Sequence, residues 1–315
     1  MYRLRLAVFG AVALAILGVS GAVASDSGEQ GRVQSMPPLH GARPNGATVT
    51  ANLTYHGGTA GIGVETAPVV YVVYWGSGWA SDPSGEASYL NNFLAGLGAG
   101  SGETWSTSTT QFCQGIPSGS SNCAGGTMIT QPASIFSASA NVWRDTSSAP
   151  SRPRQRDLAA EAVRAAAHFG NTNPAANASV QYVIATARGR SASGFGTQYC
   201  AWHSSVNSAY GNLAYTNLPY MTDAGASCGQ NFVNAGSAGL LDGVSIVEGH
   251  EYAETVTDQY PSSGWLDSGG AENADKCAWI SSGQGASANI TLNGKAYAVQ
   301  SLWSNATSNC VMSYP

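Results

Sequence analysis

Charged residues are scarce in this chain. Lys, Arg, Asp and Glu together make up 10% of its 315 residues, against roughly 25% in ordinary globular proteins. The formal net charge is −5, so the chain lacks the surplus of Lys and Arg that nucleic-acid binding requires. We therefore expect no nucleic-acid partner. The composition instead suits an extracellular protein with a surface of hydroxyl and amide groups.

Long apolar runs are absent except near the N-terminus. Arg3 and Arg5 precede the apolar stretch 6–19, and the small residues 22–24 follow it. This is the pattern of a secretory signal peptide, which we assign to residues 1–24. No later stretch approaches the roughly 18 unbroken apolar residues of a membrane span. The sequence thus predicts a secreted, extracellular protein without a membrane span.

The stretch that follows the signal peptide has no hydrophobic period. Residues 25–49 are rich in Gly, Pro, Ser and Gln, which favours a flexible leader. A removable pro-segment is the alternative. No stretch after residue 50 has the composition of a linker, and we predict one extracellular domain over residues 50–315.

The cysteines lack the C-x2-C spacing of a zinc-thiolate site. There are six of them, an even number in a chain predicted to be exported, which indicates disulfides and not a thiol nucleophile. Six cysteines allow many connectivities, so the pairing does not follow from the count. Proximity along the chain favours Cys113–Cys123, Cys200–Cys228 and Cys277–Cys310.

Two other catalytic signatures are missing. No G-x-S-x-G elbow occurs, so no serine stands in a recognisable nucleophile context. The Gly-rich stretches lack both the GK[ST] ending of a phosphate loop and the dinucleotide spacing. Neither a serine hydrolase nor a nucleotide-binding protein is favoured.

What is present is a regular alternation of strand and helix patterns. Strands interleaved with helices favour a layered α/β (α+β) domain, and we predict a mixed sheet, a central helix and a C-terminal β-hairpin. The hairpin is expected around Asn293-Gly294, because Asn-Gly between alternating runs is a strong hairpin signal. The predicted strands are 68–75 and 180–186, the predicted helices are 86–97, 156–169 and 239–258, and the hairpin covers 288–303.

The central helix carries an H-E-x-x-E pentad. His250 and Glu254 lie four residues apart, so they share one helical face at about 6 Å between Cβ atoms and can hold one cation. Glu251 lies about 100° further round the helix and would activate a water molecule. In the better known pentad a second His stands where this chain has Glu254.

A metal site needs a further protein ligand. Glu272 follows Glu254 by eighteen positions, and Asp275 comes shortly afterwards. In zinc peptidases of the thermolysin type, the gluzincins, a later Glu is the third ligand and a nearby Asp orients the first His. Glu272 and Asp275 resemble that pair, which makes the predicted set His250, Glu254 and Glu272, with Asp275 behind His250. So many carboxylate ligands admit Ca²⁺ or another divalent ion besides Zn²⁺.

The alternative to a metal site is an ordinary helix whose carboxylates are solvated or capped. Against it, seven carboxylates and one His crowd into residues 248–275 of a charge-poor chain, and a cation would offset their mutual repulsion. His203 is a further candidate, as a ligand or as a donor to an oxyanion, although a His near a disulfide cysteine is more often structural. We expect structural roles for His56 and His168 and none for His40.

Several short motifs resemble the EXORDIUM-like, phosphate-induced secreted proteins. The resemblance covers residues 50 to 312, and it implies an extracellular, cell-surface-associated protein without a well-defined enzymatic activity. Its motifs are Tyr55-His-Gly-Gly58, Tyr74-Trp75-Gly76, Cys200-Ala-Trp, Leu241-Asp-Gly, Glu272 with Asp275 and Cys277, the hairpin Asn293-Gly-Lys-Ala-Tyr297 and Cys310.

Together these features lead to two hypotheses. The first is a secreted, zincin-like metallopeptidase acting on peptide or protein substrates, in which Glu251 and His203 are catalytic and His250, Glu254 and Glu272 bind the metal. The second is a non-catalytic extracellular protein that binds cell-wall carbohydrate through Trp and Tyr residues. In either case we expect a monomer.

Overall fold

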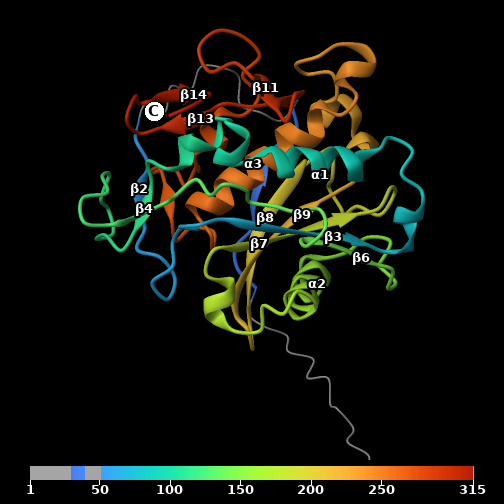
Figure 1. The fold of residues 1–315 in the computed structure, drawn as a ribbon, viewed down its shortest axis with the longest axis horizontal. Coiled ribbons are helices and arrows are strands. Elements are labelled where there is room, and N and C mark those ends of the chain that lie inside the picture. Colours follow the sequence, from blue (N-terminus) through green and yellow to red (C-terminus); the bar gives the residue numbers. More distant parts are fainter. Residues whose placement is uncertain (1–29, 40–50, 315) are drawn as a thin grey trace, which may run out of the picture.

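The computed structural model describes residues 30–39 and 51–314, and these form a layered arrangement around one mixed sheet (Figure 1). The strand order is β1-β8-β9-β7-β3-β6. Strand β8 runs antiparallel to both of its neighbours, whereas β7, β3 and β6 pair in parallel, as do β7 and β9. The bounds are β1 Gln34–Met36, β3 Val69–Trp75, β6 Val142–Asp145, β7 Val180–Thr186, β8 Ala201–Ser208 and β9 Gly211–Leu218.

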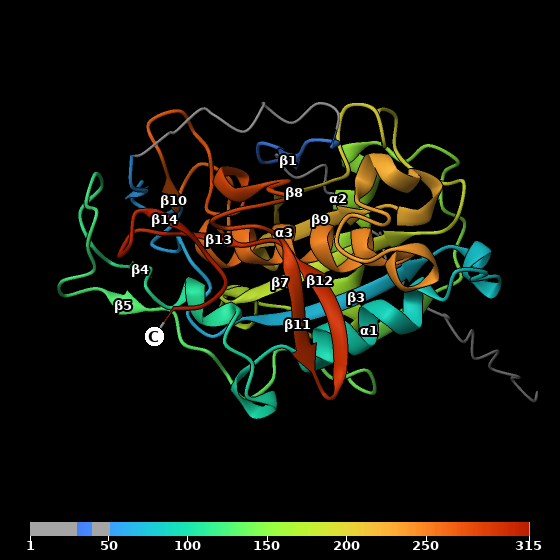
Figure 2. The same ribbon diagram turned by 90° about the horizontal axis from the view of Figure 1, so that it is seen from above.

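Helices cover both faces of this sheet. Helix α2 (Gln155–His168) packs on one face, and α3 (Asp242–Thr257) lies across the other. Helix α1 (Glu86–Gly96) packs on the outer side of α3, and the β11–β12 hairpin also lies against α3 (Figure 2). All sixteen residues of α3 are buried as a result, so the polar residues of this helix lie in the interior.

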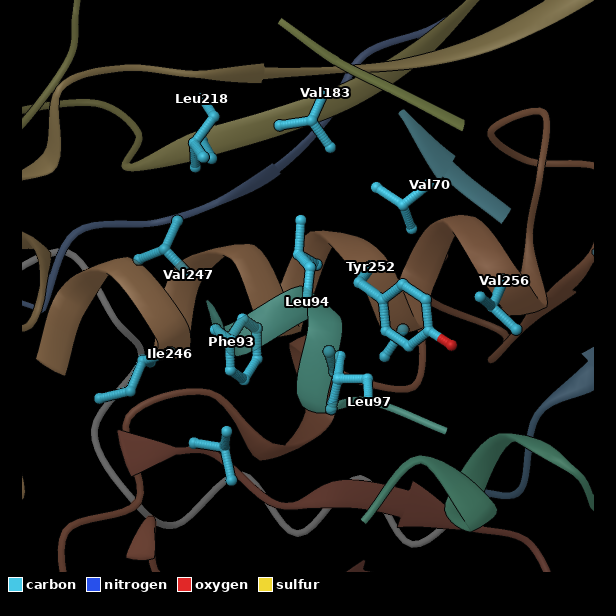
Figure 3. Packing of buried hydrophobic residues seen from close by; sticks show 14 of the residues in the cluster. Val70, Phe93, Leu94, Leu97, Val183, Leu218, Ile246, Val247, Tyr252 and Val256 are labelled. Carbon is cyan, nitrogen blue, oxygen red and sulfur yellow. The ribbon is translucent and has the colours of Figure 1, made fainter. Parts of the chain in front are cut away.

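Successive side chains along the strands point to opposite faces of the sheet, and each face has its own hydrophobic core. On β7, Val183 faces α3, while Tyr182 and Ile184 face α2. Figure 3 shows the α3 side, where Val183 approaches the helix from the sheet and Leu94 approaches it from α1. Because both faces of the central strands are covered, all seven residues of β7 are buried, which is typical of parallel strands between helix layers.

Most of the predicted elements are confirmed. The expected strands 68–75 and 180–186 correspond to β3 and β7, and the three expected helices correspond to α1, α2 and α3. The central helix begins three residues later than predicted, because Gly236–Gly239 forms a 3₁₀ turn. The C-terminal hairpin consists of β11 (Ala288–Leu292) and β12 (Lys295–Val299). Its turn residues Asn293 and Gly294 both have positive φ, at 50° and 78°, as a type I′ turn requires.

The remaining elements are short. Three two-stranded sheets pair β2 (Thr54–Tyr55) with β10 (Trp265–Leu266), β4 (Cys113–Gln114) with β5 (Thr127–Met128), and β13 (Leu302–Ser304) with β14 (Asn309–Val311). The 3₁₀ helices cover Ser77–Ala80, Ala99–Ser101, Ser106–Thr109, Pro174–Asn177, Met221–Asp223, Gly225–Cys228, Gly236–Gly239 and Asp275–Cys277.

The prediction of a flexible leader over residues 25–49 is wrong for residues 30–39. There β1 adds to the sheet beside β8, and Gln34 lies opposite His203. Met36 is fully buried in the core on the α3 side, and Trp279 donates its indole N–H to the carbonyl of Pro37. The buried side chains of Met36 and Pro38, the Trp279 hydrogen bond and the backbone hydrogen bonds to β8 hold this segment. Residues 25–29 and 40–49, the predicted signal peptide and His40 lie outside the described residues.

The three disulfides pair as proximity along the chain suggested. They join Cys113 to Cys123, Cys200 to Cys228, and Cys277 to Cys310. Such bonds persist in oxidising compartments outside the cytosol. Within residues 30–39 and 51–314, no helix is long and apolar enough to cross a membrane.

Candidate metal centre

Helix α3 places the pentad in the interior of the molecule. His250, Glu251 and Glu254 each have no exposed surface. The His250 Nε2 atom lies 3.0 Å from Glu254 Oε1, as expected for residues four apart on one helical face. Two donor atoms at this separation can bind the same ion, because each would lie about 2 Å from it.

The ring of His250 is oriented from its other side by Gln300. The Nε2 amide of Gln300 donates to the carbonyls of Ala274 and Ser301, which turns its Oε1 atom toward His250 Nδ1 at 3.0 Å. Nδ1 therefore carries the proton in the neutral ring, and Nε2 presents its lone pair toward Glu254. A partner of this kind fixes the tautomer of a metal-binding His.

Asp275 supplies the third donor at this end of the site. Its Oδ1 atom lies 3.8 Å from His250 Nε2, and its backbone N–H donates to Glu254 Oε1 at 2.9 Å. The ligand atoms of His250, Glu254 and Asp275 all lie within 4.8 Å of one another. We predicted that Asp275 would orient His250 from behind. Gln300 occupies that position instead, and Asp275 lies on the ligand side of the ring.

A second group of donors forms around His203, which β8 contributes from the sheet. His203 Nε2 lies 3.6 Å from Glu254 Oε2, the oxygen that does not face His250. His203, Glu251 and Glu254 again offer ligand atoms within 4.8 Å of one another. Glu254 therefore belongs to both groups, with one oxygen toward each histidine.

Glu272 lies closest to His203. Its Oε2 atom is 3.0 Å from His203 Nε2, whereas Asp275 completes the group of His250 and Glu254. Glu272 and Asp275 are only three residues apart, and Asp275, which begins the 3₁₀ turn Asp275–Cys277, contacts Glu254 of the helix. The structure thus brings together all the predicted site residues, but Asp275 stands beside His250 and Glu254 where Glu272 was predicted, and Glu272 lies against His203.

Glu251 has no hydrogen-bond partner for either carboxylate oxygen within the described ranges 30–39 and 51–314. The same holds for Glu254 Oε2 and His250 Nε2. Buried polar atoms are nearly always paired in native proteins. These orphaned oxygen and nitrogen atoms converge on one region and are of the types that divalent ions accept. The residues present therefore fit a divalent cation.

The pKa values reflect the same concentration of buried charge. Burial raises the pKa of Glu251 to about 8, although His250 opposes the shift. Burial and the Glu254 carboxylate raise the pKa of Asp275 to about 7. Burial alone would lower the pKa of His250, but Glu254 and its neighbours outweigh it and raise the pKa to about 9. Without a cation, protons on these groups balance the carboxylates.

Two more acidic residues lie in this interior. Glu248, one turn before Glu251, has both carboxylate oxygens unpaired among the described residues, and burial raises its pKa well above the usual range. Glu65 accepts a hydrogen bond from Gln181 at 3.0 Å, and burial raises its pKa to about 8. Glu65 and Gln300 were missed from sequence. The polar pair Gln300-Ser301 inside the apolar run of the last strands is the signal that could have found Gln300.

Two disulfides hold the segments that deliver the distant donors. Cys277, bonded to Cys310, comes two residues after Asp275. Cys200, bonded to Cys228, comes three residues before His203. The site thus consists of one helix and two cross-linked segments. His56 is exposed in its turn, and His168 stacks on Trp143 with ring centroids 4.3 Å apart.

A groove lies next to β1 on the α2 face of the sheet. Trp202, Tyr199 and Gln155 are among the residues that line it. Trp202 packs in the core on the α2 side, whereas the neighbouring His203 points to the α3 side and its carboxylates. The groove therefore lies on the other side of the sheet from the candidate centre.

No family model, curated protein or solved structure matches this chain.

Proposed function

We propose that the protein is a secreted, metal-dependent peptidase with a zincin-like layered fold. His250, Glu254 and Asp275 would hold a divalent ion, with Zn²⁺ as the first candidate. The observation that carries this proposal is the convergence of His250 Nε2, whose ring Gln300 orients through Nδ1, with Glu254 Oε1 3.0 Å away and with Asp275. The three disulfides support the extracellular location.

When bound, the ion would supply Lewis-acid polarisation of the scissile carbonyl and acidify a water molecule. Glu251 is the base of this proposal. Its carboxylate would accept a proton from the attacking water and return it to the amine that leaves. Because Glu251 makes no hydrogen bond within the part of the chain that the structure describes, no protein donor occupies the carboxylate lone pairs that would accept the proton.

We expected His203 to act as a ligand or as a donor to an oxyanion. Its Nε2 atom faces Glu272 and Glu254, so it cannot donate to an oxyanion from that atom. When one ion is bound beside His250, we assign His203 to holding these two carboxylates in position. Its Nδ1 atom has no partner among the described residues.

The first prediction tests Glu251 as the base. Glu251→Gln keeps the size of the side chain but removes the proton acceptor. We expect peptide cleavage to fall by about 10²-fold or more, while the bound ion is retained. Cleavage of a quenched fluorescent peptide library and elemental analysis of the purified full chain measure the two properties.

Glu103→Gln is the matched control, because Glu103 is also buried but bonds Gly98 and Ser106 and belongs to neither donor group. Cleavage by the control should stay near that of the wild type. Metal-free wild-type protein whose melting temperature is the same with and without chelator would contradict the proposal.

A further inference from the structure

The two donor groups place Glu254 between two histidines. Its Oε1 atom lies 3.0 Å from His250 Nε2 and its Oε2 atom lies 3.6 Å from His203 Nε2. The two histidines belong to different groups, each with ligand atoms within 4.8 Å of one another. A carboxylate that directs one oxygen to each of two donor groups has the geometry of a bridging ligand. In two-ion sites the ions lie about 3.5–4 Å apart.

The charge of the region is also too large for one divalent ion. Glu251, Glu254, Asp258, Glu272 and Asp275 are five carboxylates around the two histidines. A single divalent ion balances less than half of this charge, and a second would balance most of it. Carboxylates in a low-dielectric interior must be neutralised by cations or by protons.

Unpaired buried atoms beside His203 indicate a place for a second cation, independently of the charge. Both oxygens of Glu251 and the Oε2 atom of Glu254 lack a hydrogen-bond partner among residues 30–39 and 51–314. Both residues are completely buried. Both belong to the group of His203, so the unpaired oxygens lie where a second ion would bind.

We propose that the chain has a second divalent-cation position, formed by His203, Glu251 and the Oε2 atom of Glu254, so that Glu254 bridges two ions. The position itself follows from geometry. Its consequence rests on the proposed function, because Glu251 is the base there. An ion at the second position engages the Glu251 carboxylate and removes it as a proton acceptor. Excess metal therefore inhibits the enzyme, whereas one ion per chain supports activity.

The test is a titration of the chelator-treated full chain with Zn²⁺, followed by native mass spectrometry and calorimetry. We expect two equivalents with distinct affinities. Asp275→Asn should weaken the first and His203→Asn should abolish the second. His168→Asn, which changes a ring stacked on Trp143, should still bind both. Peptide cleavage by the wild type should rise with the first equivalent and fall with the second.

A measurement on the wild type alone covers the case in which His203→Asn does not fold. Titration with Mn²⁺ should give the electron paramagnetic resonance signal of an exchange-coupled pair once two equivalents have bound. One equivalent, with only the isolated Mn²⁺ signal, would overturn the second position and leave the proposed function standing. No bound ion at all would overturn both.

Discussion

At the scale of single residues, the centre depends on a side chain outside the helix. Gln300 holds His250 through Oε1 and is itself held through Nε2 by the carbonyls of Ala274 and Ser301. Ala274 directly precedes Asp275 in the chain. The Gln300 amide thus connects the His250 ring with the segment that carries Asp275. Its removal should disturb both ligands.

The second prediction concerns this amide. Gln300→Met keeps the length of the side chain and removes its hydrogen bonds, so the His250 ring loses its fixed tautomer. We expect the affinity for the first Zn²⁺ to fall by about 10- to 100-fold. Competition with a chromophoric chelator measures the affinity. Gln284→Met, at an exposed site bonded to the Cys310 carbonyl, is the control, and an equal loss in both variants would remove the specific role of Gln300.

The contact between ligands within one helix could be predicted from sequence. The contacts made by residues from distant segments could not. The period of one helix brings His250 and Glu254 together whatever surrounds them. The order of Glu272 and Asp275 depends instead on a 3₁₀ turn within a loop, for which the sequence carries no periodic signal. Gln300 reaches His250 across fifty positions, and only the packing of the last strands on α3 determines that contact.

At the scale of elements, α3 depends on close backbone contacts. A Cβ atom on Gly243 would lie 2.0 Å from the carbonyl oxygen of Cys228, so the start of the helix touches the segment that Cys200 cross-links. The nearest atoms to a Cβ on Gly249 would belong to the side chains of Trp105, at 3.2 Å, and Phe93, at 3.5 Å. The same substitution should therefore have different effects at the start and in the middle of this helix.

The third prediction compares Gly243→Ala with Gly249→Ala. Each gains about 1 kcal/mol of helix propensity. At Gly243 the backbone must move, and overpacking of this kind typically costs about 1–3 kcal/mol or more. We expect Gly243→Ala to be clearly less stable than Gly249→Ala when both are unfolded in urea. Equal midpoints, or a more stable Gly243→Ala, would show that the helix start can shift freely.

Helices and strands were predicted correctly where their apolar residues form a strong pattern. The strand 180–186 and the helices were found because their apolar residues are dense or regularly spaced. Strands β8 and β9 were missed because many of their inward positions are polar, including His203 and Thr216. These strands line a polar interior. The polar residues that supply the candidate site therefore interrupt the apolar pattern from which a strand is predicted.

At the scale of the whole molecule, buried acids determine how stability depends on pH. Glu65 is an example outside the two ligand groups. Its pKa is raised by burial to about 8 in the folded chain, against about 4.3 for an unperturbed Glu. Between these values the folded chain holds a proton that the unfolded chain releases. Stability is therefore full below about pH 4.3 and is lost as the pH rises through 8.

The fourth prediction follows from this fall in stability with rising pH. The ion-free wild type should become less stable from about pH 5 to 8, and Glu65 contributes up to about 1.4 kcal/mol per pH unit to that slope. Glu65→Gln keeps an acceptor for Gln181 without a titrating proton, so its stability should fall less steeply. Urea unfolding in chelator at several pH values measures both slopes. Parallel curves would mean that Glu65 is not protonated in the folded chain.

The position of β1 has a consequence for handling the protein. Three residues of β1 cover the open edge of β8, and a sheet edge without a partner recruits strands from other molecules. A preparation that begins after residue 39 would expose this edge together with the cavity left by Met36. Such a truncated chain is expected to self-associate through β8, so recombinant protein intended for metal analysis should keep residues 30–39.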